Sequence, residues 1–212
     1  MTTNNGGDAN AHTDGIRRFG IEVMNSLPYE PNADQMMLIA QFGHFLFHRS
    51  DDAVFLLGGY AGTGKTSMTG AIVKTLTEHN IKCVLLAPTG RAAKVFTEYS
   101  HHTAYTIHRK IYRQKAYGTE GFGIADNRHT DTFFIVDEAS MISNTPGDNS
   151  VFGSGRLLDD LIHYVYSGAG CRLVLIGDRA QLPPVGQTDS PALSRAVLQS
   201  YGLTVFETFL AD

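Results

Sequence analysis

The sequence predicts an α/β fold in which a parallel β-sheet is flanked by helices. Short apolar runs alternate with segments of helical periodicity along most of the 212 residues. The runs are apolar on both faces, as is typical of strands in a parallel sheet that helices cover on both sides. A chain of this length that is 42% hydrophobic can bury the core of one sizeable domain, but not that of a second large domain.

The expected elements follow from this alternation. Helical periodicity begins at Asn32, and further helices are expected at about 65–78 and 90–99. Strands are expected at 53–59, 82–88, 132–140 and 171–181, with a further short one at 203–206. Residues 1–15 are expected to form a disordered leader, so the folded domain is expected to span 16–212.

Two segments rich in Gly, Asn, Asp or Ser interrupt the alternation. The segment 143–155 is interpreted as a surface loop. The segment 114–131 is either a loop or a short hairpin, and we place that hairpin insertion at about 112–131. No internal repeat is evident.

Charge and cysteine content restrict the function classes. The net charge of −4 and a pI near 6.1 argue against a globally basic nucleic-acid binder, so any nucleic-acid site must be local. Cys83 and Cys171 each open an apolar run and are interpreted as core thiols in a reducing cytoplasm. The sequence contains neither a signal-peptide pattern nor a run of about 18 apolar residues. We therefore expect a cytoplasmic protein without a membrane partner.

A phosphate-binding loop is the most specific local signal. Residues 59–66, "GYAGTGKT", match the P-loop pattern and lie between an expected strand and an expected helix. Backbone N–H groups and the helix N-terminus would surround the phosphates of ATP. Lys65 would reach the β- and γ-phosphates, and the Thr66 hydroxyl would bind Mg²⁺. The expected nucleotide-binding residues at the loop are Gly59, Ala61, Gly62, Thr63, Gly64, Lys65, Thr66 and Ser67.

Two adjacent acids provide the partner carboxylates that a P-loop needs. Four apolar residues lead to Asp137 and Glu138 in "FFIVDEAS", at the end of an expected buried strand. Burying two carboxylates there costs free energy unless they bind a partner such as a metal ion. Asp137 is expected to hold the Mg²⁺, directly or through water, and Glu138 to act as the general base that polarises the attacking water.

A third expected strand delivers an amide to the same sheet edge. In "LIGDRAQLPPVGQ", Pro183 and Pro184 stiffen the turn that follows Gln181. An amide cannot act as a base, but it can hydrogen-bond a γ-phosphate or the attacking water. We therefore expect Gln181 to be a catalytic residue.

Five motifs in order resemble a known family. "GGYAGTGKTS", "LLAPTGRAAK", "TIHRKI", "IVDEASMI" and "LIGDRAQLPPVGQ" resemble motifs I, Ia, Ib, II and III of RecD-like superfamily-one DNA helicases. They span 58–187, most of the chain outside the leader. One departure is Arg179, where the family usually has proline, but it leaves Asp178 and Gln181 in register.

The resemblance implies a P-loop NTPase with a RecA-like motor domain that hydrolyses ATP with Mg²⁺ and contacts single-stranded DNA or tailed duplex DNA. Translocation in this family runs 5′ to 3′, and a small hairpin insertion between motifs Ia and II helps to split the duplex. The implied DNA-binding residues are Pro88, Thr89, Arg91, Thr106 and His108.

Gln35 has two interpretations. "NADQ" resembles the glutamine motif of the family, in which Gln35 would pair with adenine. Asn32 and Gln35 also have the spacing of a capping box, in which the glutamine serves the end of a helix. The residues favour neither interpretation over the other.

The family places a second RecA-like domain across the cleft, and its arginines assist phosphoryl transfer. The chain ends before the arginine motif, so we expect an N-terminal motor domain whose partner domain is absent here, with poor activity alone. Two alternatives are a P-loop ATPase that acts on protein partners and a nucleotide-binding module without useful turnover.

Overall fold

A computed structural model describes residues 5–114, 121–145, 151–181, 184 and 189–211. The helices are α1 (Asn5–Asn25), α2 (Ala33–Leu46), α3 (Lys65–Glu78), α4 (Gly90–Ser100), α5 (Ile107–Ile111), α6 (Leu157–Tyr166) and α7 (Arg195–Ser200), with two 3₁₀ turns at Ala139–Met141 and Pro191–Leu193. The strands are β1 (Ala53–Gly59), β2 (Lys82–Ala87), β3 (Ala104–Thr106), β4 (Tyr112–Gln114), β5 (Phe122–Ile124), β6 (Thr132–Val136), β7 (Arg172–Gly177) and β8 (Thr204–Leu210).

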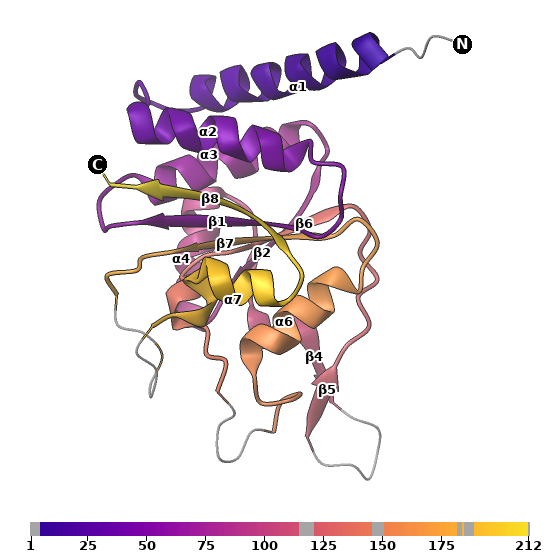
Figure 1. The fold of residues 1–212 in the computed structure, drawn as a ribbon. Helices are drawn as coiled ribbons and strands as arrows, with labels where there is room; N and C mark the ends of the chain where they lie inside the picture. The colour runs from indigo at the N-terminus through magenta and orange to yellow at the C-terminus, as the bar shows by residue number, and fades with distance from the viewer. Residues whose placement is uncertain (1–4, 115–120, 146–150, 182–183, 185–188, 212) are drawn as a thin grey trace.

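A six-stranded parallel sheet forms the centre of the molecule (Figure 1). The strand order is β3-β2-β6-β7-β1-β8, and Leu57 of β1 lies opposite Ile176 of β7 and Thr208 of β8. Every residue of β1 is buried. Because all six strands are parallel, their carboxyl ends meet at one edge, where the loops that follow β1, β6 and β7 lie together. The predicted α/β parallel-sheet fold is confirmed.

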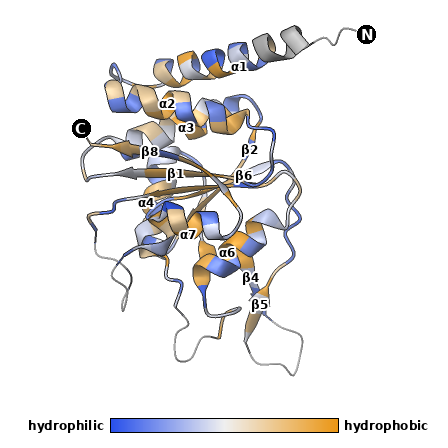
Figure 2. Ribbon diagram, in the orientation of Figure 1, coloured by the Kyte–Doolittle hydropathy of each residue, from blue (hydrophilic) through white to orange (hydrophobic). Residues whose placement is uncertain are grey.

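Helices cover both faces of this sheet. The α2 and α3 helices pack on one face, with α1 outside α2, while α6 and α7 lie on the other face (Figure 1). Each face buries its own apolar cluster: Phe42, Phe55 and Met68 belong to one, and Leu56 and Leu175 to the other. The sheet strands are mostly hydrophobic, whereas much of the outer surface of the helices is hydrophilic (Figure 2). Burial of both strand faces accounts for their continuous apolar sequences.

A separate antiparallel hairpin lies within the segment expected to be an insertion. Tyr112 of β4 pairs with Ile124 of β5, and Gln114 pairs with Phe122. The predicted tip of the insertion, 115–120, lies outside the described residues. Tyr112 is anchored because its hydroxyl donates a 2.6 Å hydrogen bond to Oδ2 of Asp160 on α6.

The structure differs from the expected disordered leader, because α1 already begins at Asn5. Residues 1–4 lie outside the described part of the chain. Two tertiary contacts to Phe47 explain the difference. A ring nitrogen of His12 lies 3.1 Å from the Phe47 carbonyl oxygen. Gly15 packs so closely on the Phe47 ring that an added Cβ would lie 2.9 Å from it. Packing on the end of α2 thus stabilises the first half of this helix, while its second half buries Phe19 and Val23 in the core.

Candidate active site

The loop between β1 and α3 has the backbone of a phosphate cradle. Gly62 and Gly64 adopt φ values of 86° and 87°, in the left-handed region that glycine enters without strain. Gly64 is the N-cap of α3, and no side chain caps this helix. The free N–H groups of the first turn therefore provide a site for an anion. The Thr63 hydroxyl is turned inward and donates to the Tyr60 carbonyl oxygen at 2.9 Å. The other polar positions of the loop, Thr66 and Ser67, are exposed, as is Ala61.

Lys65 folds back over the P-loop. Its Nζ donates to the carbonyl oxygens of Gly59 at 2.7 Å and Tyr60 at 2.5 Å. Burial lowers the pKa of Lys65, and the carboxylates of Asp178, Glu138 and Asp137 counteract this effect, in that order of size. The predicted lysine and both predicted acids therefore lie at one sheet edge, together with Asp178, which the sequence analysis gave no role.

Both carboxylate oxygens of Asp137 are engaged. Oδ2 accepts a 2.8 Å hydrogen bond from the Tyr99 hydroxyl of α4, and Oδ1 accepts a 2.9 Å bond from the backbone N–H of Glu138. Burial raises the pKa of Asp137, and these two hydrogen bonds, together with Lys65, oppose the rise. Tyr99 was not predicted as a site residue, because its side chain approaches Asp137 only through the packing of α4.

Glu138 is held in an unusual backbone conformation at the end of β6. Its φ of 54° lies in the left-handed region, which is uncommon for a residue with a side chain and frequent at active sites. Burial raises the pKa of Glu138, Asp137 adds to the rise, and a hydrogen bond from Gln181 opposes it. Glu138 is half-buried. An acid with this environment suits a general base that works closer to neutral pH than a free carboxylate.

Gln181 connects the loops that follow β6 and β7. Its Oε1 accepts a 3.1 Å hydrogen bond from the Ser140 hydroxyl, and its amide lies close enough to Glu138 to oppose the rise in that pKa. Asp178 holds the start of this loop, since its Oδ1 accepts from the backbone N–H of Ala180 at 2.8 Å. Gln181 thus lies beside Glu138 at the sheet edge, and its predicted hydrogen bond to a γ-phosphate or the attacking water stays a prediction. The predicted proline turn at 183 and 184 lies partly outside the described residues.

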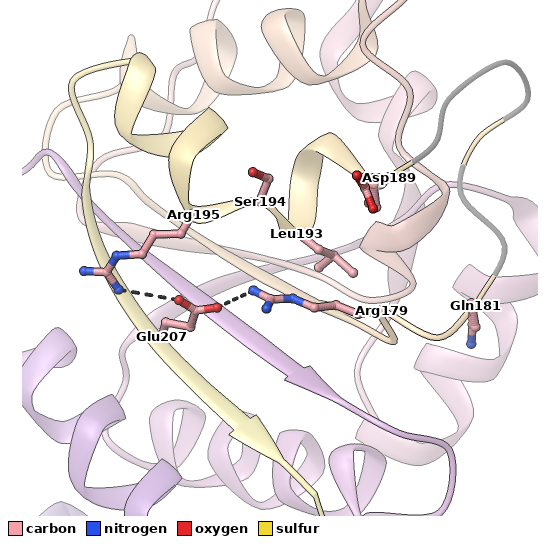
Figure 3. Close-up of a pocket in the computed structure, with 8 residues that line it drawn as sticks. Arg179, Gln181, Asp189, Leu193, Ser194, Arg195 and Glu207 are labelled. Atoms are coloured by element: carbon pink, nitrogen blue, oxygen red, sulfur yellow. Dashed lines mark hydrogen bonds and ion pairs between the residues drawn. The ribbon is translucent and has the colours of Figure 1, made fainter.

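Arg179, the departure from the family pattern, bridges the β7 loop to β8. Its guanidinium forms an ion pair with Glu207, which Arg195 of α7 also approaches at 3.5 Å. Figure 3 shows both arginines directed at Glu207, while Gln181 lies apart from them. These residues line a cavity of about 360 Å³. Arg179 thus forms an ion pair within its own domain, and arginine in place of the usual proline leaves Gln181 hydrogen-bonded to Ser140.

Gln35 makes the contacts of a capping box. Its Oε1 accepts from the Asn32 N–H at 3.2 Å, and its own N–H donates to Oδ1 of Asn32 at 2.9 Å. The Gln35 Nε2 also donates to the carbonyl oxygen of Thr63 in the P-loop at 3.3 Å, and the side chain is buried. The start of α2 is therefore tied to the phosphate cradle. The side-chain amide thus uses one of its two N–H donors and one of its two acceptor lone pairs in these bonds.

The predicted DNA-binding residues lie in two groups. Thr89 and Thr106 are the N-caps of α4 and α5, and their hydroxyl oxygens accept the N–H groups of Ala92 and Arg109, each at 3.2 Å. Pro88 is half-buried beside Thr89, and Arg91 is exposed. His108, in contrast, is half-buried among aromatic rings, 5.1 Å from the ring of Phe152. Burial lowers the pKa of His108 and so favours the neutral form of the ring.

The donors at this edge fit a magnesium ion that arrives with a nucleotide. No cluster of three or more His, Cys, Asp and Glu side chains suited to a metal occurs in the part of the chain that the structure describes. Mg²⁺ bound to phosphates keeps several waters and needs only one or two protein ligands. The Thr66 hydroxyl on the first turn of α3 and the Asp137 carboxylate are ligands of the required type.

Comparison with known proteins identifies the family. A family model described as an AAA domain matches residues 32–200. The chain belongs to this family. This AAA domain is 35% identical over 136 residues to the ATP-dependent RecD2 DNA helicase of Deinococcus radiodurans, an alignment that covers 62% of the chain and 16% of that protein.

The fold of this AAA domain also matches a solved helicase structure. The crystal structure of Pif1 helicase from Candida albicans superposes with a TM-score of 0.53 at 20% sequence identity, over 87% of this chain and 40% of that one. The resemblance to RecD-like superfamily-one helicases, inferred from the motifs, is confirmed. The chain spans a minor part of both relatives. Among the described residues, no helix combines the length and apolar character needed to cross a membrane.

Proposed function

We propose that this chain is the ATP-binding motor domain of a DNA helicase. One observation carries the proposal: the P-loop Lys65 lies within electrostatic reach of Asp137 and Glu138, which another strand delivers to the same sheet edge. The similarity to an ATP-dependent DNA helicase supports ATP as the nucleotide and DNA as the substrate. These activities belong to the relative as a whole, of which the chain matches 16%.

The side chains divide the proposed hydrolysis between them. The P-loop N–H groups and Lys65 would bind the phosphates once Lys65 exchanges the carbonyl oxygens of Gly59 and Tyr60 for phosphate oxygens. Glu138 would accept a proton from the attacking water, and Gln181 would orient that water or the γ-phosphate. Bound Mg²⁺, held by Thr66 and Asp137, would neutralise negative charge on the phosphates.

Single-stranded DNA is the proposed partner at the ends of β2 and β3. The N-cap threonines Thr89 and Thr106 keep their hydroxyl protons free for a phosphate oxygen, because each hydroxyl acts as acceptor in its cap. Arg91 is exposed near Thr89 and can add a charge. His108 would contribute packing rather than charge, since its ring is half-buried and burial disfavours its charged form.

We further propose that strand separation needs a second RecA-like domain. The catalytic edge provides Lys65 as its cation, while Arg179, the neighbouring arginine after β7, is paired with Glu207. In related P-loop enzymes an added arginine accelerates hydrolysis by about 10³–10⁵-fold. A second domain is also what would convert hydrolysis into stepping, because it opens and closes a cleft.

The test compares ATP hydrolysis and strand separation on a 5′-tailed duplex. Residues 1–212 should bind ATP, turn it over slowly with little stimulation by DNA, and separate no strands. Robust unwinding by these residues alone would contradict the proposed need for a second domain. Nucleotide binding that is unchanged in Lys65→Ala would contradict the proposed active site.

A further inference from the structure

A basic groove lies at the base of the hairpin insertion. It has a volume of about 530 Å³, and we define it by Lys110, Arg113, Arg128 and His129. One wall comes from α5 and β4, and another from the segment between β5 and β6 together with Tyr164 of α6. That segment leads into the amino end of β6, whereas the P-loop follows the carboxyl end of β1, several strands away from β3 and α5.

The basic groove gathers positive charge without a matching counter-charge. Lys110, Arg113 and Arg128 face a single acid, Asp126, and none of the three forms an ion pair within the described residues. Burial and the nearby Arg113 lower the pKa of Lys110, so the like charges penalise one another. Such a cluster in a chain with a net charge of −4 indicates an anionic ligand, which would remove that penalty.

The walls of the groove are held in place before any ligand arrives. The Arg113 guanidinium donates to the carbonyl oxygens of Arg109 at 2.8 Å and Tyr112 at 2.7 Å, at the end of α5. On the facing wall, the Asn127 side chain donates to the Tyr164 carbonyl oxygen at 2.9 Å. Pre-organised cations lose less conformational entropy on binding than mobile ones do.

The lining and position of the groove favour a nucleic-acid backbone. Apolar Ile124 and Tyr164 lie beside guanidinium groups that suit phosphate oxygens. It begins where α5 ends, and this helix of five residues spans about 7 Å at 1.5 Å per residue. The other end of α5 is Thr106, a predicted contact for single-stranded DNA. A tailed DNA whose single strand lies at Thr106 can therefore reach the groove with its duplex arm.

We propose that the basic groove binds the backbone of the duplex arm of a tailed DNA, separately from the single strand at Thr89 and Thr106. The hairpin β4–β5 stands beside the groove, so a tailed DNA whose single strand lies at Thr106 could place its duplex arm on this side of the hairpin. The inference rests on the proposed DNA-motor function. It adds a second contact surface to that function and names the form of DNA that the surface takes.

The test measures DNA affinity of residues 1–212 by fluorescence anisotropy, with a 5′-tailed duplex and with a single strand of the tail sequence. The triple variant Lys110→Gln, Arg113→Gln, Arg128→Gln should lose about tenfold or more in affinity for the tailed duplex, and less than about twofold for the single strand. For the tailed duplex, the slope of the logarithm of the binding constant against the logarithm of the salt concentration should become shallower by about 2–3. A Lys110→Arg, Arg113→Lys, Arg128→Lys variant should retain most of the affinity.

Arg17→Gln, Arg18→Gln, Lys74→Gln is the matched control, because it removes the same charge from exposed positions on α1 and α3. It should leave both affinities within about twofold. Equal losses on both DNAs, or no loss on either, would overturn the groove inference while ATP binding through Lys65 stands. Preference of the groove for acidic protein or lipid vesicles over the tailed duplex would also overturn it. Failure of ATP binding alone would instead contradict the proposed function.

Discussion

The Tyr99 hydroxyl donates a 2.8 Å hydrogen bond to Oδ2 of Asp137, joining α4 to the acidic pair. The α4 helix starts at Thr89, a predicted DNA contact, and Asp137 is the predicted magnesium ligand. Tyr99 also packs against the P-loop helix, where an added Cβ on Gly70 would lie 3.4 Å from its carbonyl oxygen. Tyr99 thus connects the predicted DNA side with the predicted nucleotide side as a positioning residue.

Removing this hydroxyl should weaken magnesium-dependent binding. Tyr99→Phe loses a hydrogen bond to a carboxylate, worth about 1.5–3 kcal/mol in total, part of which orients Asp137. We expect the Mg²⁺ concentration for half-maximal ATP binding to rise about three- to tenfold, and nucleotide affinity in EDTA to stay constant. Titration of a fluorescent ATP analogue with Mg²⁺ measures both quantities.

Tyr201→Phe is the control for Tyr99→Phe. Tyr201 also donates its hydroxyl to an aspartate, Asp159 of α6, on the opposite sheet face from α3. This variant should lose stability and keep the magnesium dependence of the parent chain. If both variants change the magnesium dependence equally, the positioning role of Tyr99 is wrong.

Glu138→Gln should lower the rate of ATP hydrolysis and raise the stability of the fold. An amide cannot accept the proton, so ATP turnover should fall about 10²-fold or more while Mg²⁺–ATP binding persists. The folded-state pKa of Glu138 is raised, so its ionisation destabilises the fold above the unfolded pKa, fully so above the folded pKa. The variant should therefore melt at a higher temperature than the parent near pH 8, with a gain that disappears as the pH falls towards 4.

Thermal melts across this pH range, with exposed Glu98→Gln as the control, test the second part of that prediction. Turnover assays test the first. Parental turnover in Glu138→Gln, or a stability gain that grows towards acid, would show that Glu138 is not the buried base described here.

The Gln35 contacts predict an effect on the P-loop rather than on base selection. Gln35→Ala removes one half of a capping box and the bond to Thr63, so the free energy of unfolding should fall by about 1–2 kcal/mol. Affinities for ATP and GTP should weaken by the same factor. Asn32→Ala is the control, since it breaks the capping box and keeps the Thr63 bond. A loss confined to ATP would support adenine recognition by Gln35 instead.

The Arg179–Glu207 pair should contribute little to stability. The two side chains are 43% and 23% exposed, and exposed ion pairs are worth about 0.2–1 kcal/mol. A double-mutant cycle with alanine at both positions, followed by urea unfolding, should give a coupling energy below about 1 kcal/mol. A coupling of several kcal/mol would mean that this pair is a structural requirement of the β7 loop.

Elements whose ends are marked by strong local signals, such as glycines, were predictable from the sequence. The limits of β1 and α3 agree with the prediction, because the glycines of the P-loop end the strand and Lys65 opens the helix. The β6 and β7 strands end earlier than predicted, at Val136 and Gly177, because Glu138 turns left-handed and Asp178 starts a turn.

Contacts between distant segments were not predictable in this way. The α1 helix depends on Phe47, and the Tyr99–Asp137 bond joins residues 38 positions apart. No pattern in the sequence near Tyr99 marks it as part of the site. The acidic pair and the P-loop were predictable because each motif carries its chemistry within a few consecutive residues.

The most direct test of the nucleotide-site assignment is equilibrium binding of Mg²⁺–ATP to residues 1–212, with Lys65→Ala and the exposed Lys74→Ala compared side by side. Lys65→Ala should keep the circular dichroism spectrum of the parent and lose measurable binding, because Lys65 is the cation of the phosphate cradle. Lys74→Ala should bind as the parent does. Equal ATP affinity in the parent, Lys65→Ala and Lys74→Ala would contradict the assignment of this edge as a nucleotide site.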